Sequence, residues 1–341
     1  MRFGLIFILL SVFGQNLNAQ IAVDPIRRKL RPVKLAPLPT DLAEISGMEF
    51  YNGYLYALND GGHPSRIYKL DTSTGTIVQT IVLPDTPNVD WEALSQDEHY
   101  FYIGDVGGNN AIRKEYAIHK FSKNLLNLGT DTLFIHSGSI EKITFTYPDQ
   151  TADSKGLEFD CEAMLIHNNK MHLFSKNWMN QYAYHYTLPL IPGNYVAEKK
   201  DSLDTKGYLL TGVTWKDNVL LFTSYTIKGR AALIVAQVQE TDLKIRQAWR
   251  IKLPWVLCSG QIEGISNNNG NTYISNEEFG FWIFKVRQKL RRLRDEKWER
   301  LRAIHSTLQT DIPSSSTPSP TSATSGKTYR SFADLRQNAP A

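Results

Sequence analysis

The sequence has little cysteine and no long hydrophobic run beyond its first residues. Only two cysteines, Cys161 and Cys258, occur among 341 residues, which is too few for a disulfide framework or a zinc cluster. They either form a single disulfide or are two small buried hydrophobic residues, and we favour the second interpretation. No segment after the first 19 residues is long and apolar enough to span a bilayer.

Signatures of several common enzyme classes are also missing. There is no G-x-S-x-G nucleophile turn, no H-E-x-x-H zinc motif and no glycine-rich phosphate loop followed by a helix. The histidines show no spacing typical of metal ligands. The sequence therefore does not support a zinc protease, a P-loop nucleotidase or a serine hydrolase of the α/β type.

Positive charge is concentrated at the end of the chain. The formal net charge is +4, yet from Arg287 onward Lys and Arg outnumber Asp and Glu by 11 to 5. The rest of the chain is therefore slightly acidic, and we expect no nucleic-acid partner for it. Residues 287–308 are predicted to form a basic amphipathic helix. It either packs on the rest of the protein, extends into solvent, pairs with another chain, or contacts the cell envelope or another anionic surface. Residues 309–341 are predicted to form a Pro/Ser/Thr-rich disordered tail.

The first 19 residues have the pattern of a secretory signal peptide. They contain one Arg, an apolar run from Phe3 to Phe13 and a small residue at Ala19. The apolar run is too short to cross a membrane. We therefore expect a protein without transmembrane segments that is secreted or periplasmic after cleavage.

A repeated unit organises the region between residues 31 and 286, where short β-type runs alternate with turns. In each copy a polar residue precedes Gly or Ala, and two strands joined by a polar turn follow. The copies are ISGMEFYNGYLYALND, WEALSQDEHYFYIGD, CEAMLIHNNKMHLFSKN, LTGVTWKDNVLLFTS and IEGISNNNGNTYISNEE. Their aligned Gly or Ala residues are 46, 70, 49 and 52 residues apart, and each interval has room for the four strands of a propeller blade.

The repeat predicts an all-β fold, a five-bladed β-propeller over residues 31–286. The alternative is six blades, with a degenerate blade hidden in the long second repeat. The fifth unit has only GFWIFKV after its first two strands and therefore lacks an outer strand. The N-terminal segment RPVKLAPLP can supply that strand and close the ring without an exposed edge.

Equivalent residues of the repeat predict a metal site. The first strand of each propeller blade lines the axis, so the residues before the aligned Gly or Ala converge there. They are Ser46, Glu92, Glu162, Thr211 and Glu263. Three facing carboxylates repel strongly unless a cation lies among them, no ring position or immediate neighbour carries Lys or Arg, and oxygen ligands favour Ca²⁺. The alternative is that these glutamates pair with Lys or Arg, or face a water-filled tunnel.

A second polar set follows the second strands and is expected at one mouth of the axial channel. It comprises Asn59, Asp60, Asp105, Asn109, Lys176, Asn177, Asn276 and Glu277. These residues either bind a small-molecule or protein ligand or serve turn geometry. In a catalytic protein, Asp60 and Asp105 are the candidate general bases.

The ring, together with FYNGYLYALNDG and QIEGIS, resembles the calcium-dependent apyrases, which are secreted nucleotidases. The resemblance covers about residues 45–286 and implies a five-bladed propeller with an axial Ser-Glu-Glu-Ser-Glu calcium ring. Ser46, Glu92, Glu162 and Glu263 map onto that ring, and Thr211 replaces a Ser. The family's Arg after paired acidic residues is absent, because Asn59-Asp60 is followed by Gly61-Gly62.

The segments EISGMEF, DWEALS, FDCEAML and QIEGIS are similar, more broadly, to phytase-like and SdiA-regulated secreted propellers. Lactonases of the gluconolactonase type also carry an axial metal. Two hypotheses follow from these resemblances. The one we favour slightly is a binding or envelope-associated module with structural Ca²⁺, and the other is a calcium-dependent hydrolase of a nucleotide, phosphate ester or lactone.

Overall fold

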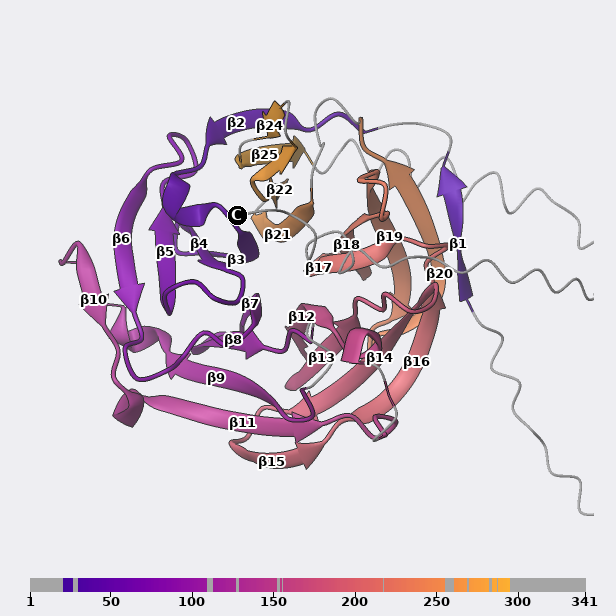
Figure 1. Cartoon of the computed structure of the whole chain (residues 1–341), viewed down its shortest axis with the longest axis horizontal. Coiled ribbons are helices and arrows are strands. Elements are labelled where there is room, and N and C mark those ends of the chain that lie inside the picture. Colours follow the sequence, from indigo (N-terminus) through magenta and orange to yellow (C-terminus); the bar gives the residue numbers. More distant parts are fainter. Residues whose placement is uncertain are drawn as a thin grey trace, which may run out of the picture.

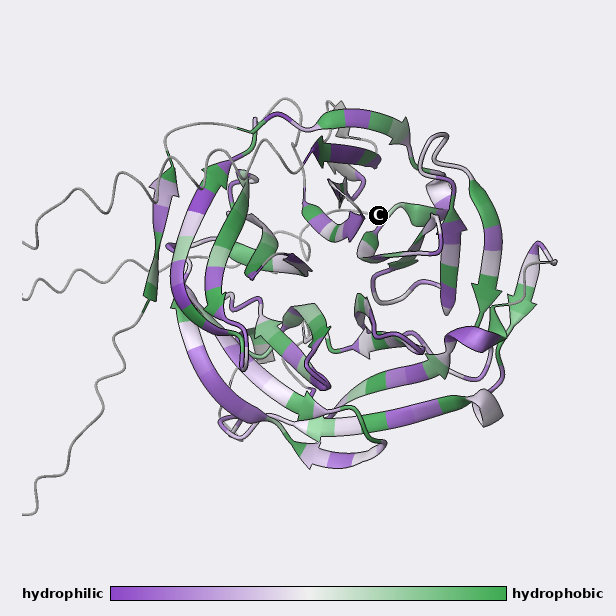
Figure 2. Ribbon diagram, turned by 180° about the vertical axis from the view of Figure 1, so that it is seen from behind, coloured by the Kyte–Doolittle hydropathy of each residue, from purple (hydrophilic) through white to green (hydrophobic). Residues whose placement is uncertain are grey.

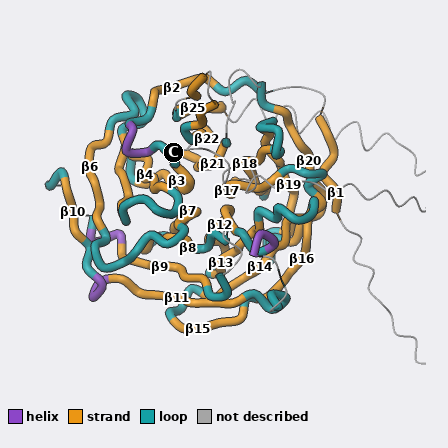
Figure 3. The backbone as a smooth tube through the Cα atoms, viewed as in Figure 1, coloured by secondary structure: helices purple, strands orange, loops and turns teal. Residues whose placement is uncertain are grey.

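The computed structural model describes residues 21–26, 30–108, 113–126, 129–151, 154, 156–216, 218–254, 261–268, 270–281, 284–286 and 288–294. The predicted signal peptide, the tail predicted to be disordered and Cys258 lie outside these residues. The described part is all-β, and its helices are short 3-10 turns (Figure 3). These turns are Thr40–Leu42, Lys123–Leu125, Ser137–Ser139 and Gly156–Glu158. No helix among the described residues is long and apolar enough to cross a membrane.

The first two repeats each form a four-stranded antiparallel meander. The first contains β3 (Ile45–Tyr51), β4 (Tyr54–Asn59), β5 (Arg66–Leu70) and β6 (Ile77–Val82). The second contains β7 (Trp91–Gln96), β8 (Tyr100–Asp105), β9 (Tyr116–Ser122) and β11 (Ile140–Thr146). Each meander gains a parallel edge strand from the following repeat, namely β10 (Thr132–Phe134) on β6 and β15 (Gly193–Val196) on β11.

The third and fourth repeats share one nine-stranded sheet. The third contributes β12 (Cys161–His167), β13 (Lys170–Ser175), β14 (Tyr182–Pro189) and β16 (Glu198–Asp204). The fourth contributes β17 (Leu209–Lys216), β18 (Val219–Tyr225), β19 (Ala231–Gln239) and β20 (Lys244–Lys252). Strand β1 (Ile21–Ile26) joins them, because it pairs in parallel with both β16 and β20.

The last sheet brings both ends of the repeat region together. Its order is β2 (Val33–Pro37), β25 (Lys289–Arg294), β22 (Asn271–Asn276) and β21 (Ile262–Asn268). Strand β2 takes the outer position expected for RPVKLAPLP. The segment GFWIFKV is not the third strand of this sheet, because it contributes to a separate hairpin of β23 (Phe279–Phe281) and β24 (Phe284–Val286).

The prediction of a helix over 287–308 is wrong for residues 289–294, which form β25. This strand pairs with β22 on one side and β2 on the other. Leu290, Arg291 and Leu293 are buried there. The spacing of Leu290 and Leu293 fits one face of a helix. In the sheet both side chains are buried, and the backbone of β25 pairs with strands on both sides. The rest of the predicted helix lies outside the described residues.

The five inner strands form a closed circle (Figure 1). Strand β3 contacts β7, β7 contacts β12, β12 contacts β17, β17 contacts β21, and β21 returns to β3. The fold is therefore propeller-like. Hydrophobic and polar residues alternate along many strands (Figure 2), and the apolar residues pack between neighbouring sheets. One such cluster contains Tyr56, Trp91, Phe101 and Phe121.

Cys161 is a buried free cysteine at the start of β12. Its Sγ lies 3.6 Å from the Phe174 carbonyl oxygen. Burial, strengthened by the nearby Asp160 carboxylate, raises the pKa of its thiol to about 12. Such a thiol is a poor nucleophile, and Cys161 acts as a small core residue.

Candidate functional site

The five predicted ring residues occupy the same place in their strands, and a β-bulge marks each one. The pairing between first and second strand shifts register across Ser46, Glu92, Glu162, Thr211 and Glu263. A bulge adds one residue to a strand and turns its side chain away from the regular alternation. All five residues are buried next to the axis.

The small residue after each ring position allows the inner strands to approach closely. A Cβ on Gly47 would lie 2.4 Å from the backbone nitrogen of Leu94, and one on Gly212 would lie 2.5 Å from the carbonyl oxygen of Glu263. Neither approach is open to a larger residue. The Gly or Ala of the repeat thus reflects packing around the axis.

The two hydroxyls of the ring bind backbone of the neighbouring inner strand. Ser46 Oγ donates to the Trp91 carbonyl oxygen at 3.1 Å, and Thr211 Oγ1 donates to the Ile262 carbonyl oxygen. These bonds connect β3 to β7 and β17 to β21. The hydroxyls therefore have a structural role whether or not their oxygens also bind a metal.

Lys176 reaches the axis from the residue after β13, and its side chain is almost fully buried. Its ammonium is paired with Glu162 and lies 3.9 Å from Glu263 Oε1. The same ammonium lies 5.0 Å from the ring centre of Trp178 and 5.1 Å from that of Tyr225. Although burial alone lowers the pKa of Lys176, both glutamates raise it well above its ordinary value, so the lysine stays charged. The alternative that the ring glutamates pair with Lys or Arg therefore holds for Glu162 and Glu263, through a lysine outside the ring positions and their immediate neighbours.

Four further carboxylates surround the three ring glutamates, which makes seven. We call this set the axial cluster: Asp60, Asp90, Glu92, Asp160, Glu162, Glu263 and Glu277. One oxygen from each of Asp60, Asp90 and Glu92 lies within 4.8 Å of the others. The same holds for Glu92, Asp160 and Glu162. The cluster therefore offers two sets of oxygens close enough to share an ion.

Asp90 and Asp160 were missed as candidate site residues, although the repeat contains a signal for them. Both stand two residues before a ring glutamate, where the other copies have Glu44, Leu209 and Gln261. The backbone oxygen at this position accepts a hydrogen bond from the end of the second strand: Val106 N to Asp90 O, and Lys176 N to Asp160 O. Aligning this position would have added two carboxylates to the site.

The pKa values of the cluster are raised first by burial and then by repulsion between its carboxylates. Burial, together with repulsion from Asp60, raises the pKa of Asp90 to about 7. Burial raises the pKa of Glu263 to about 8 although Lys176 lowers it. Burial beside Asp60 and Glu162 raises the pKa of Glu92 well above its ordinary value. A cation among these oxygens would reverse such shifts, since it favours the ionised carboxylates.

The predicted asparagines of the mouth are engaged in local structure. Asn59 Nδ2 donates to the Asp41 carbonyl oxygen at 2.6 Å. Asn177 Oδ1 accepts from Met179 N at 2.9 Å, and Asn276 Nδ2 donates to the Glu277 carbonyl oxygen at 2.7 Å. The Asn177 contact agrees with the turn-geometry interpretation, whereas Asn59 connects the end of β4 to the distant residue Asp41. Asn109 lies outside the described residues.

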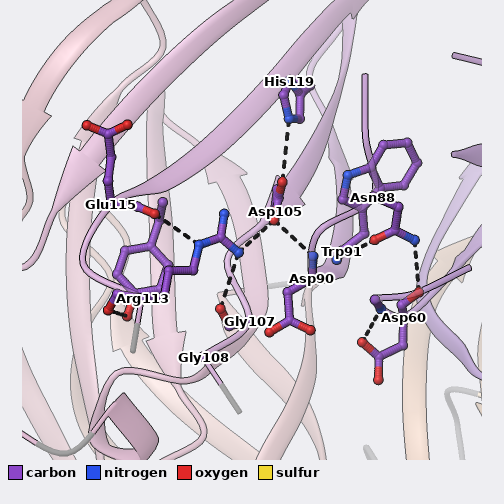
Figure 4. A network of polar contacts seen from close by, with 12 residues as sticks. Asp60, Asn88, Asp90, Trp91, Asp105, Gly107, Gly108, Arg113, Glu115 and His119 are labelled. Atoms are coloured by element: carbon purple, nitrogen blue, oxygen red, sulfur yellow. Dashed lines mark hydrogen bonds and ion pairs between the residues drawn. The ribbon is translucent and has the colours of Figure 1, made fainter. Parts of the chain in front are cut away.

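Asp105 lies at the centre of a separate polar network (Figure 4). Its Oδ1 accepts from Arg113 Nη1 at 2.7 Å and from Asp90 N at 3.1 Å, and its Oδ2 lies 3.8 Å from His119 Nε2. Burial alone would raise the pKa of Asp105, but His119 and Arg113 lower it below its ordinary value. A carboxylate held ionised in this way is a weak general base. The network borders a cavity of about 310 Å³ whose lining includes Glu115.

Comparisons with known proteins reveal only remote likenesses. No protein-family model matches the chain, and no curated protein is similar to it. A solved structure from Bacteroides uniformis described as a 6-phosphogluconolactonase has 13% identity and a TM-score of 0.34, over 71% of this chain and 64% of that one. A bifunctional GH43-CE protein of Bacteroides eggerthii has 10% identity and a TM-score of 0.42, over 75% of this chain and 35% of that one.

An exo-β-1,3-galactanase from Phanerochaete chrysosporium has 14% identity and a TM-score of 0.36, over 59% of this chain and 47% of that one. This chain thus spans less than two thirds of each of these three structures. Likenesses of this degree assign neither an activity nor a ligand. The resemblance to apyrases and phytases stays a prediction from the sequence.

Proposed function

We propose that this protein is an exported, calcium-binding five-bladed β-propeller that acts as a binding or envelope-associated module. One observation carries the calcium assignment. The axial cluster places seven carboxylates together, and among the described residues Lys176 is the cation paired with them. Arg113 is paired with Asp105, which is not a member of the cluster.

The chemistry of the cluster selects the kind of ion. All its candidate ligands are carboxylate oxygens, which suits a hard cation such as Ca²⁺ better than Zn²⁺ or copper. Buried carboxylates without a counter-ion are costly, so the folded protein gains stability if an ion occupies the cluster. Mg²⁺ fits less well because it requires near-octahedral geometry and retains its waters.

The five-bladed architecture is supported by the closed circle of inner strands and by the three further strands that complete a four-stranded set with each of them. Two of these sets merge through β1, and the last is completed by β2. The ring of Ser46, Glu92, Glu162, Thr211 and Glu263 agrees with the predicted resemblance to apyrase-type propellers. The basic segment 287–308, of which residues 289–294 form β25, supplies the proposed contact with an envelope or another anionic surface.

Removal of calcium tests the proposal directly. We expect the full-length exported protein to melt several degrees lower in a chelator than in millimolar Ca²⁺. A ligand present at 100 times its Kd stabilises the fold by about 2.7 kcal/mol, and Mg²⁺ in place of Ca²⁺ should restore less. Equal melting temperatures with and without Ca²⁺ would refute the calcium assignment.

A calcium-dependent hydrolase is the second candidate, favoured by the buried Asp105–His119 pair on the wall of the cavity. In this pair His119 would accept the proton of a water that attacks a nucleotide, phosphate ester or lactone, and Asp105, itself a weak base, would orient the imidazole. A screen of these substrates in Ca²⁺ decides between the candidates. Turnover that Asp105→Asn or Asp60→Asn abolishes in a folded protein would favour the hydrolase, and no turnover would favour the binding module.

A further inference from the structure

The carboxylates of the axial cluster differ in how many hydrogen-bond donors and cations they contact. Most of these contacts lie around Glu162, Glu263 and Glu277. Glu162 and Glu263 share the ammonium of Lys176. Gln261 Nε2 donates to Glu263 Oε1 at 3.2 Å and to Glu277 Oε2 at 2.6 Å. This side of the cluster therefore has a cation and amide donors of its own.

Asp160 is also supplied with donors, whereas Glu92 is not. Asp160 Oδ1 accepts from Gly108 N at 3.0 Å, and its Oδ2 accepts from Trp178 Nε1 at 2.8 Å. Glu92 is 2% exposed, and its Oε1 has no hydrogen-bond partner among the described residues. Glu162 Oε2 and Glu263 Oε2 also have none, but the other oxygen of each of these glutamates faces the Lys176 ammonium. A buried carboxylate oxygen without a donor is rare in folded proteins and indicates a missing ligand.

Two glycines keep the space around Glu92 and Asp90 free of side chains. A Cβ on Gly107 would lie 2.5 Å from Asp90 Oδ2 and 2.7 Å from Glu92 Oε1. A Cβ on Gly61 would lie 2.6 Å from Asp90 Oδ1. Asp60 and Asp90 are only partly buried, so this side of the cluster is open to solvent.

We propose that one divalent cation of the Ca²⁺ type binds off the axis, between Asp60, Asp90 and Glu92, and that Lys176 replaces a cation beside Glu162 and Glu263. The proposal deepens the proposed calcium function and depends on it. Two oxygens bound to one Ca²⁺ at about 2.3–2.6 Å can be about 5 Å apart at most. The three carboxylate oxygens lie within 4.8 Å of one another, so they meet this condition without movement of the backbone.

The off-axis site needs neither hydroxyl of the predicted ring. Asp60 follows β4, Asp90 precedes β7 and Glu92 lies within β7, so the ligands come from the first two sheets. Ser46 and Thr211 remain donors to backbone carbonyls. Water entering beside the partly exposed aspartates supplies the remaining coordination positions of the ion.

Calcium titration calorimetry on the chelator-stripped full-length protein separates this site from the axial ring. Asp90→Asn removes a carboxylate that only the off-axis site uses, and we expect Kd for Ca²⁺ to rise at least about tenfold. Thr211→Val removes an oxygen that only the axial ring uses, and Kd should change less than about twofold. Asp60→Asn removes a second ligand of the off-axis site, which follows β4 in the first sheet. Circular dichroism confirms that each variant is folded.

The outcomes are distinguishable. A loss of affinity in Thr211→Val as large as in Asp90→Asn, or unchanged affinity in both aspartate variants, would overturn the off-axis site but keep the calcium function. No Ca²⁺ binding by the unaltered protein would overturn both.

Lys176→Met tests the role assigned to the lysine. With its ammonium removed, Glu162 and Glu263 should accept a second ion, and the stoichiometry should rise from about one to about two Ca²⁺ per chain. An unchanged stoichiometry in the folded variant would refute the view that Lys176 replaces a cation.

Discussion

The inner strands carry two polar groups of opposite character, one largely buried and one half-buried. Near their starts lies the axial cluster, where carboxylates outnumber their donors. Near their ends lies a single carboxylate, Glu49, which accepts from Gln96 Nε2 at 2.9 Å and from Ser266 Oγ at 3.4 Å. Lys123 Nζ donates to Gln96 Oε1 at 2.6 Å and so holds the Gln96 amide in place.

The two groups differ in whether the protein itself supplies a partner for each buried polar atom. A polar group with its donors in place contributes to the fold, because each buried atom has its partner. A group that lacks donors destabilises the protein until something binds. The protein supplies hydrogen-bond donors to the Glu49 carboxylate. The axial cluster, by contrast, requires a cation that binds from solution.

The largest effect is expected from loss of the buried ammonium in the axial cluster. In a chelator, Lys176→Met should lower the free energy of unfolding by about 3–5 kcal/mol, because it leaves Glu162 and Glu263 without their charge partner. Denaturant unfolding measures the loss, and added Ca²⁺ should restore part of it. A loss below 1 kcal/mol in the chelator would show that the cluster does not depend on its lysine.

Removal of one unpartnered carboxylate should have effects of opposite sign with and without calcium. In a chelator, Glu92→Gln should raise the free energy of unfolding by about 1–3 kcal/mol, since it removes a buried charge that repels its neighbours. In Ca²⁺ the variant should lose the stabilisation that the ion gives the unaltered protein. The matched variant Glu49→Gln should change the free energy of unfolding by the same amount in a chelator and in Ca²⁺. If Glu92→Gln also changed it equally in both conditions, the proposed difference between the two groups would be wrong.

Much of this arrangement could be predicted from the sequence, because propeller repeats place equivalent residues together. The five inner strands, the outer place of β2 and the convergence of Glu92, Glu162 and Glu263 follow from the aligned repeats. The position of Lys176 does not follow, since its side chain crosses from the second strand to the axis. Strand β25 was mistaken for a helix because the spacing of Leu290 and Leu293 fits one helix face, and only pairing with β2 and β22 decides the matter.

The Glu49 group predicts a pH dependence. Burial raises the pKa of Glu49 to about 7, even though Gln96 and Lys123 lower it. Its folded pKa is therefore above the unfolded value, and its contribution to stability is complete below about pH 4.5 and is lost as the pH rises through 7. Because Glu49 keeps some contact with solvent, we expect a loss of about 1–2 kcal/mol. Denaturant unfolding in a chelator should show this loss as a change, between pH 4.5 and 8, in the difference in unfolding free energy between the unaltered protein and Glu49→Gln, because the axial cluster titrates in both.

The smallest effect is expected at a ring hydroxyl. Ser46→Ala removes the bond to the Trp91 carbonyl oxygen and should lower the free energy of unfolding by about 1 kcal/mol. The loss should be the same in Ca²⁺ and in a chelator, because the hydroxyl connects strands and is not required for the ion. A loss confined to Ca²⁺ would place Ser46 among the metal ligands.

The central claim is that the axial cluster needs a cation that the protein does not supply. The most direct test is the metal content of the exported protein, purified without chelator and analysed by inductively coupled plasma mass spectrometry. We predict about one equivalent of calcium per chain, reduced to background in Asp90→Asn. Unaltered protein that is folded and contains no divalent metal, even after dialysis against Ca²⁺, would contradict the account.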